Sequence, residues 1–275
     1  MVATPNPPLE GELTDPIITL TSDFGLQDYY VGAMKGVIAR IAPRAHVIDI
    51  SHDIGAQNVA HGAFVLHYAA REFPPTTVHC AIVDPGVGSA RRALAFTSAT
   101  HLWVGPDNGL LSFAFNQVEG SIYAIDSTRL PPVRKSATFH GRDLFAPAAA
   151  RLSDGVPLDE IGTPITDPIL LPSATCQLGD DFVEGHIIHI DQFGNLVSNI
   201  PRHVLDKLGE DPSIRVGSTA RINGLNTTYA DVAPGQLLAL IGSADLVEIS
   251  VNQGHAARQL GIELGAPIRI ELSHT

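Results

Sequence analysis

Residues 78–91 read V-H-C-A-I-V-D-P-G-V-G-S-A-R, and this stretch decides the fold. Its first six residues form an apolar, β-branched run of the length that is typical of a fully buried strand. The run ends at Asp84, which Pro85 biases toward extended geometry because proline restricts the residue before it. Asp84 therefore follows a core strand directly, at the strand end where open α/β sheets bind their ligands. Arg91 lies close enough along the chain to fold back and pair with Asp84.

The segments before this stretch alternate between strand and helix signals. Residues 17–21 and 45–50 are short apolar runs that we interpret as buried strands, and residues 29–41 and 59–73 have helical spacing of apolar residues. We expect Asp28 to be the N-cap of the first of these helices. Strand, helix, strand, helix, strand is the order of a parallel sheet with right-handed crossovers.

Each of these three strands is followed by a carboxylate: Asp23, then Asp49 or Asp53, then Asp84. Because parallel strands end at the same edge of a sheet, three carboxylates there predict a ligand site. The alternative is that these residues only form tight turns, with Arg91 as a solvated surface charge.

The pattern of apolar runs and turn residues changes along the chain, and this change predicts two domains. Residues 1–15 are rich in proline and acidic residues and form a loose tail, neither a signal peptide nor a membrane span. Residues 16–165 form an α/β domain with a mainly parallel central sheet, and residues 166–181 form a linker. Residues 182–275 form a C-terminal antiparallel β-barrel domain, because short alternating runs are separated there by Gly, Asn and Asp turns. The strands expected in it are residues 183–190, 196–200, 214–222, 237–241, 247–251 and 268–272, with one helix at residues 256–260.

Composition narrows the range of functions. The 275 residues carry a formal net charge of −12, which argues against nucleic acid as a partner because phosphate binding needs Lys and Arg. Two cysteines, Cys80 and Cys176, have no metal-ligand or disulfide spacing, so a reducing cytoplasm is the expected compartment. The sequence has no H-E-x-x-H, G-x-S-x-G, Walker A or G-x-G-x-x-G motif, and we expect no metal site.

A second polar loop, T-F-H-G-R-D at residues 138–143, could supply acid–base chemistry. An Asp–Arg pair such as Asp84 and Arg91 can orient a water, and His140 can accept a proton or hydrogen-bond the same water. The alternative is that His140 caps a helix or fills a polar gap.

In the C-terminal domain, the densest polar cluster is D-Q-F-G-N at residues 191–195. Phe193 could stack on a planar ring, and Asn195 offers a donor and an acceptor to a base edge. A hairpin turn explains the same residues equally well. Asn252, in the polar turn V-N-Q-G-H, has the same two interpretations.

Six motifs in order identify a family. They are L-T-S-D-F-G, Y-V-G-A-M-K-G, V-D-P-G-V-G-x-x-R-R, P-D-N-G-L-L, T-F-H-G-R-D-L-F-A-P-A-A and I-D-Q-F-G-N-L-V-S-N-I. Together they closely resemble the S-adenosyl-L-methionine hydrolases, also called hydroxide adenosyltransferases, which are relatives of the fluorinases and chlorinases. The resemblance covers residues 17–272 and implies an N-terminal α/β domain, a C-terminal β-barrel, and a homotrimer that binds its ligand between neighbouring subunits.

The resemblance also implies roles for residues that match the family motifs. Asp84, Arg91 and His140 would hold the attacking water, and Asp23 would bind the ribose hydroxyls. In the second domain, Asp191 would bind the methionine ammonium, Phe193 and Asn195 would contact the adenine, and Asn252 would make further methionine or adenine contacts.

The expected reaction is therefore hydrolysis of S-adenosyl-L-methionine to adenosine and L-methionine, without metal or redox cofactor. One alternative is a chlorinase that makes 5′-chloro-5′-deoxyadenosine. The interval at residues 92–105 is short where the fluorinase has an extra loop, which favours water over fluoride but does less to exclude chloride. The other alternative is a module that binds S-adenosylmethionine or adenosine without turnover; the intact Asp84, Arg91 and His140 argue against it.

Overall fold

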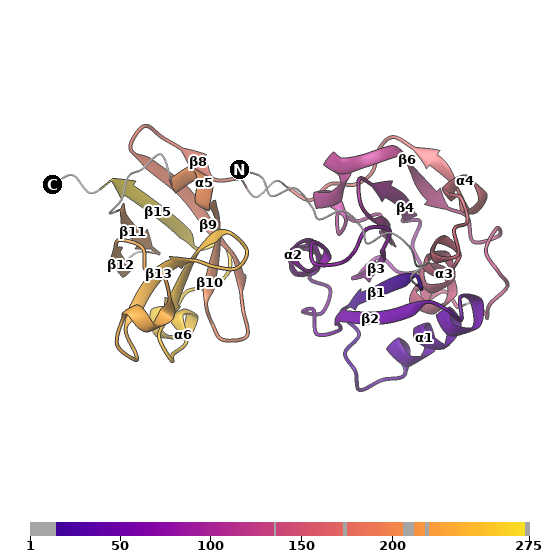
Figure 1. Ribbon diagram of the computed structural model, residues 1–275, viewed down its shortest axis with the longest axis horizontal. Helices are drawn as coiled ribbons and strands as arrows, with labels where there is room; N and C mark the ends of the chain where they lie inside the picture. The colour runs from indigo at the N-terminus through magenta and orange to yellow at the C-terminus, as the bar shows by residue number, and fades with distance from the viewer. Residues whose placement is uncertain (1–14, 135, 173–174, 206–211, 218–219, 273–275) are drawn as a thin grey trace. The chain divides into compact units, whose positions relative to one another are not determined.

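The structure, a computed structural model, describes residues 15–134, 136–172, 175–205, 212–217 and 220–272. The chain divides into two compact units, residues 1–171 and 172–275 (Figure 1). The boundary between the units falls inside the segment predicted as a linker, although the extent of that linker stays a prediction. The predicted tail, apart from Asp15, lies outside the described residues.

The N-terminal unit is built on a mixed sheet. Among the described residues its strand order is β2-β1-β3-β5-β4-β6-β7, with the first four strands mutually parallel and the last three antiparallel to their neighbours. The strands are β1 (Ile17–Ser22), β2 (His46–Ser51), β3 (Val78–Ile82), β4 (Ala93–Ser98), β5 (Leu102–Pro106), β6 (Val118–Ile125) and β7 (Gly162–Ile165). The apolar run that begins at Val78 forms β3, whose five residues are all buried.

Helices cover both faces of this sheet. Helices α1 (Tyr30–Ile41) and α3 (Ala146–Ser153) pack on one face, and α2 (Val59–Ala70) packs on the other, as Figure 1 shows. Leu20 and Ile82 point into the core beneath α1 and α3, whereas Ala81 and Val83 point into the core beneath α2. They do so because successive strand residues face opposite sides of the sheet. The shorter helices are η1 (Ser112–Gln117), η2 (Gly141–Phe145) and α4 (Leu158–Ile161).

Two local predictions for this unit were wrong. Helix α1 has Tyr29, not Asp28, as its N-cap, with no side-chain cap; the Tyr29 ring lies against Tyr30 at 4.7 Å, so aromatic packing accompanies the helix start. Strand β2 is not buried: it lies at the edge of the sheet, where β1 is its only partner among the described strands, and Ile48 is 40% exposed. An edge strand lacks a neighbour on one side, which the apolar run by itself does not reveal.

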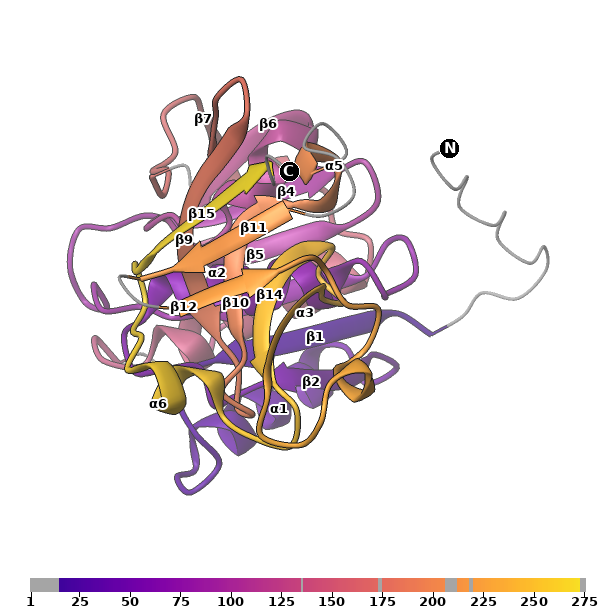
Figure 2. The ribbon, with the colours of Figure 1, turned by 90° about the vertical axis from the view of Figure 1, so that its left-hand side faces the viewer.

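The C-terminal unit is an antiparallel, nearly closed barrel, as predicted. The order among its described strands is β12-β11-β15-β9-β10-β14-β13, with β8 paired on β9. An isolated bridge joins Asn226, in the segment after β12, to Leu240 in β13. Figure 2 shows β12, β11 and β15 running side by side. The strands are β8 (Gln177–Leu178), β9 (Phe182–Ile190), β10 (Leu196–Pro201), β11 (Pro212–Val216), β12 (Ala220–Asn223), β13 (Leu237–Ile241), β14 (Leu246–Val251) and β15 (Pro267–Leu272).

One predicted strand of the barrel is in fact a hairpin. Residues 214–222 were expected to be continuous, but β11 and β12 pair antiparallel, with Val216 opposite Ala220. Gly217 has a φ of +57°, a left-handed conformation that ends the strand. The helix α6 (Ala256–Leu260) is confirmed, whereas the short helices α5 (Arg202–Leu205) and η3 (Tyr229–Asp231) were missed.

A buried histidine in the N-terminal unit makes stability depend on pH. His79, fully buried on β3, bonds through Nδ1 to the Thr19 hydroxyl at 2.8 Å and stacks on Trp103 at 4.6 Å. Burial, with a smaller effect of the adjacent His101, lowers the pKa of His79 to about 3. An unfolded histidine has a pKa of about 6.5. Between pH 6.5 and about 3, His79 is therefore protonated in the unfolded state but not in the folded state.

We therefore expect the free energy of unfolding to fall with decreasing pH below about 6.5, with His79 contributing about 1.4 kcal/mol per pH unit. The variant Thr19→Val/His79→Phe, which removes both hydrogen-bonding partners, should show a shallower slope between pH 6.5 and 5 in urea unfolding. His46→Gln, at a histidine whose side chain is 68% exposed, is the control. An equal slope in the double variant and the wild type would contradict the prediction.

Candidate active site

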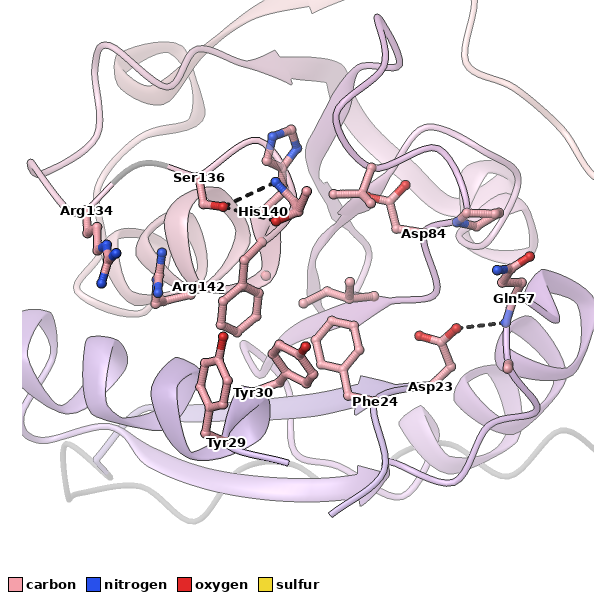
Figure 3. Close-up of a pocket in the computed structure, with 17 residues that line it drawn as sticks. Asp23, Phe24, Tyr29, Tyr30, Gln57, Asp84, Arg134, Ser136, His140 and Arg142 are labelled. Atoms are coloured by element: carbon pink, nitrogen blue, oxygen red, sulfur yellow. Dashed lines mark hydrogen bonds between the residues drawn. The ribbon is translucent and has the colours of Figure 1, made fainter. Parts of the chain in front are cut away.

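A cavity of about 780 Å³ opens at the carboxyl ends of β1 and β3. Asp23 follows β1 and Asp84 follows β3, and the loop that carries His140 faces them across the cavity (Figure 3). This is the edge of a parallel sheet at which the sequence predicted a ligand site.

Asp84 and Arg91 form a buried ion pair. Arg91 Nε donates to Asp84 Oδ1 at 2.8 Å and to Oδ2 at 3.0 Å, and Arg91 Nη2 also donates to Oδ2. The two side chains are only 9% and 5% exposed. Such a pair is rigid, because both groups have lost their water and depend on each other.

His140 joins this pair through the same guanidinium. Arg91 Nη2 lies 3.0 Å from His140 Nδ1. Because arginine can only donate, Nδ1 must accept, so the proton of a neutral His140 resides on Nε2. Burial, followed by the Arg91 charge, lowers the pKa of His140, against smaller opposing effects of Asp84 and Asp143. His140 is therefore a neutral imidazole that presents an N–H group.

Backbone packing brings the two motifs together. Gly88, in the loop after β3, has a φ of +78°, and a Cβ atom there would lie 2.6 Å from the carbonyl oxygen of Ala137. The glycine thus lets the D-P-G-V-G loop approach the segment that carries His140. That segment continues into η2, a turn of π-helix, and then into α3; π-helical turns are frequent at functional sites.

Asp23 is held at the other side of the cavity. Its Oδ2 accepts from the backbone N–H of Gln57 at 2.8 Å, while Oδ1 has no hydrogen bond among the described residues. Of the predicted edge carboxylates, neither Asp49 nor Asp53 is among the described residues that line the cavity. Asp49 lies within β2, opposite Leu20, and pairs with Lys35 at 2.6 Å, so its position in the strand keeps it away from the strand end.

Several residues that line this cavity have no role predicted from the sequence. Neighbouring rings form an aromatic wall. The centre of the Tyr30 ring lies 5.1 Å from the centre of the Phe139 ring and 5.8 Å from that of Phe24. Two cations, Arg134 and Arg142, also line it. Their only sequence signal was membership of the same motifs or of the loop before T-F-H-G-R-D.

In the C-terminal unit, three predicted residues share one turn between β9 and β10. Asp191 Oδ1 accepts from the backbone N–H groups of Phe193 and Asn195, both at 2.9 Å, and Oδ2 accepts from Asn195 Nδ2 at 2.9 Å. This is an Asx-type turn that leaves the Phe193 ring 66% exposed. Asn252 lies elsewhere in the barrel, where its Nδ2 donates to the carbonyl of Val232 at 2.7 Å.

Two kinds of feature are absent from the described residues. No group of three or more His, Cys, Asp or Glu side chains among them could hold a metal ion. Within the same part of the chain, no helix combines the length and the apolar character that a membrane crossing needs.

The fold and the site define a protein with an α/β unit, an Asp–Arg–His constellation at its strand ends, and an antiparallel barrel. The chain belongs to the SAM hydroxide adenosyltransferase family: the N-terminal domain model of that family matches residues 18–162 and the C-terminal domain model matches residues 185–269.

Comparisons with individual proteins agree. The chain is 41% identical to an (R)-S-adenosyl-L-methionine hydrolase from Salinispora arenicola, over 93% of this chain and 97% of that protein. A fluorinase from Nocardia brasiliensis is more distant, at 25% identity over 94% of this chain and 97% of that protein. The crystal structure of a conserved protein from Thermotoga maritima superposes with a TM-score of 0.86 at 35% identity, covering 92% of this chain and 99% of that one.

Proposed function

We propose that this protein hydrolyses S-adenosyl-L-methionine to adenosine and L-methionine. The observation that carries the proposal is the buried Asp84–Arg91 pair with His140 bound to it, beside a cavity large enough for the substrate. Membership of the family and similarity to hydrolases over most of the chain support the same reaction.

The reaction needs little chemical machinery. The water oxygen forms a bond to the ribose C5′ carbon while the C5′–S bond breaks, and the bonding pair becomes a lone pair on the methionine sulfur. The sulfonium leaves as a neutral thioether, so no acid is needed at sulfur. What remains is to align water with C5′, and orientation of this kind is worth about 7–11 kcal/mol in well-aligned model systems.

Each member of the constellation has a distinct part in this step. The Nε2–H group of His140 donates to the water oxygen and fixes its direction, and the Arg91 charge stabilises hydroxide character as it develops. Asp84, whose carboxylate lines the cavity, accepts the proton that the attacking water releases. Asp23 accepts hydrogen bonds from the ribose hydroxyls through its available Oδ1.

We assign further substrate contacts to the C-terminal unit. Asp191 binds the methionine ammonium, Phe193 and Asn195 contact the adenine, and Asn252 makes a further methionine or adenine contact. The protein works as a cytoplasmic homotrimer with its site between subunits, without metal, redox cofactor, nucleic acid or membrane. Sedimentation analysis tests the assembly, since any mass other than three times the 29.1 kDa chain contradicts it.

The tautomer of His140 can be tested by substitution. A glutamine offers one acceptor to Arg91 and one N–H donor to the water, as the neutral imidazole does. We expect His140→Ala to lower kcat about a hundredfold and His140→Gln to recover about tenfold of that loss. Steady-state kinetics at saturating substrate provide the measurement. If His140 were the general base, glutamine would be as inactive as alanine.

The reaction itself is tested by incubating the protein with S-adenosylmethionine in ¹⁸O-water containing chloride and analysing the nucleosides by mass spectrometry. Adenosine with the heavy oxygen at C5′ is the expected product. A chlorinated nucleoside would instead make the protein a chlorinase, and bound substrate without any product would make it a binding module.

A further inference from the structure

We propose that Arg134 and Arg142 bind the α-carboxylate of the substrate's methionine part, so that they select substrates that carry an amino-acid carboxylate. This inference rests on the proposed function. It gives a binding role to the end of the cavity that lies away from Asp84 and Asp23.

The charges around the cavity are segregated. Figure 3 shows Arg134 and Arg142 on one side, and Asp23 and Asp84 on the opposite side. A ligand that fills the cavity therefore meets hydrogen-bond acceptors at one end and cations at the other.

Arg142 is held in place by its own surroundings. Nε and Nη2 donate to the two oxygens of Asp143 at 2.6 and 3.0 Å, and the guanidinium lies 4.9 Å from the centre of the Phe139 ring. Asp143 is buried, with its side chain 6% exposed, so the pair is fixed rather than fluctuating on the surface. Nη1 makes no hydrogen bond to the described residues and is available to a ligand.

Arg134 provides the second cation. It is exposed, lines the same cavity, and has no ion-pair partner among the described residues. Two guanidinium groups of which one is anchored and one is unpaired suit a carboxylate, which accepts from arginine through two oxygens.

The order of groups along the cavity matches the order of groups in the substrate. The ribose diol corresponds to Asp23, and the sulfonium to the rings of Phe24 and Tyr30, because aromatic ring faces attract a cation. The carboxylate, at the far end of the methionine chain, then reaches the arginines. No other group of the molecule carries a negative charge.

The test compares S-adenosylmethionine with its decarboxylated analogue, which lacks only this carboxylate. The wild type is expected to bind S-adenosylmethionine more tightly, and Arg134→Gln should reduce that preference about tenfold. The paired variant Arg142→Gln/Asp143→Asn, which keeps a neutral hydrogen-bonded pair and avoids an unpaired buried carboxylate, should reduce it by a similar factor. Adenosine affinity should be unchanged in both variants.

Arg44→Gln, at an exposed arginine outside the cavity, removes the same charge and should leave the preference intact. An unchanged preference in both cavity variants would overturn the inference. Failure of the proposed function would be recognised separately, because the wild type would then bind S-adenosylmethionine but release no adenosine. In that case, the dissociation constants measured by calorimetry would still decide where the carboxylate binds.

Discussion

Arg91→Ala is expected to lower kcat by about two to three orders of magnitude, the range seen when one preorganised donor to a developing charge is removed. Arg91 is the residue through which the constellation is connected, since it donates to both oxygens of Asp84 and to Nδ1 of His140. Without it, His140 loses its fixed tautomer and the developing hydroxide loses its nearest cation. Single-turnover kinetics with S-adenosylmethionine measure the loss directly.

The same substitution has a structural cost that must be separated from the chemical one. Asp84 is 5% exposed, and removing one partner of a buried ion pair costs about 3–5 kcal/mol. The double variant Asp84→Asn/Arg91→Ala leaves no buried charge and should recover most of the stability, as judged by its melting temperature, but none of the turnover. Because this variant also lacks Asp84, the proposed proton acceptor, regained activity would contradict the roles of both residues. A melting temperature as low as that of Arg91→Ala would contradict the cost of the unpaired buried charge.

Gly194→Ala is expected to destabilise the C-terminal unit by about 2–5 kcal/mol and to weaken binding of S-adenosylmethionine. Gly194 has a φ of +87°, and a Cβ atom there would lie 1.9 Å from Nδ1 of His255. The left-handed conformation costs an alanine about 1–2 kcal/mol and the overpacking about 1–3 kcal/mol. Since Gly194 lies between Phe193 and Asn195, the turn that carries the proposed adenine contacts must shift.

Gly265→Ala is the matched control. Gly265 has nearly the same φ, +83°, but no heavy atom lies within 4 Å of the position that a Cβ would take. It should therefore show only the conformational cost, about 1–2 kcal/mol, and normal substrate affinity. Calorimetric unfolding and titration with S-adenosylmethionine compare the two. Equal stability losses in both variants would mean that contact with His255 is unimportant.

Local patterns in the sequence were sufficient for much of the fold. The apolar run of β3, the helical spacing of α1 and α2, and the alternating runs of the barrel each depend on neighbouring residues, so their type follows from periodicity. The pairing of Arg91 with Asp84 was also accessible, because the Pro-Gly turn between them returns the chain on itself.

The position of each strand within the sheet could not be predicted from the sequence. The residues of β2 and β3 both predict buried strands, yet only β3 has neighbours on both sides, and that difference arises from strand order. The same order decides that Asp23 and Asp84 line the cavity while Asp49 pairs with Lys35 instead. The break between β11 and β12 likewise depends on one glycine adopting a left-handed conformation that its sequence permits but does not require.

The order and type of most elements followed from the sequence alone, and six motifs were enough to identify the family and the residues that we propose to hold the water. How those residues contact one another depends on the folded chain. The contact between Arg91 and His140 joins positions 49 residues apart and selects the tautomer, and Arg134 and Arg142 line the same cavity as Asp23 and Asp84 only because the chain folds. The physical reason is that periodicity and turn preferences act over a few residues, whereas ion pairing and burial depend on distances that the folded chain sets.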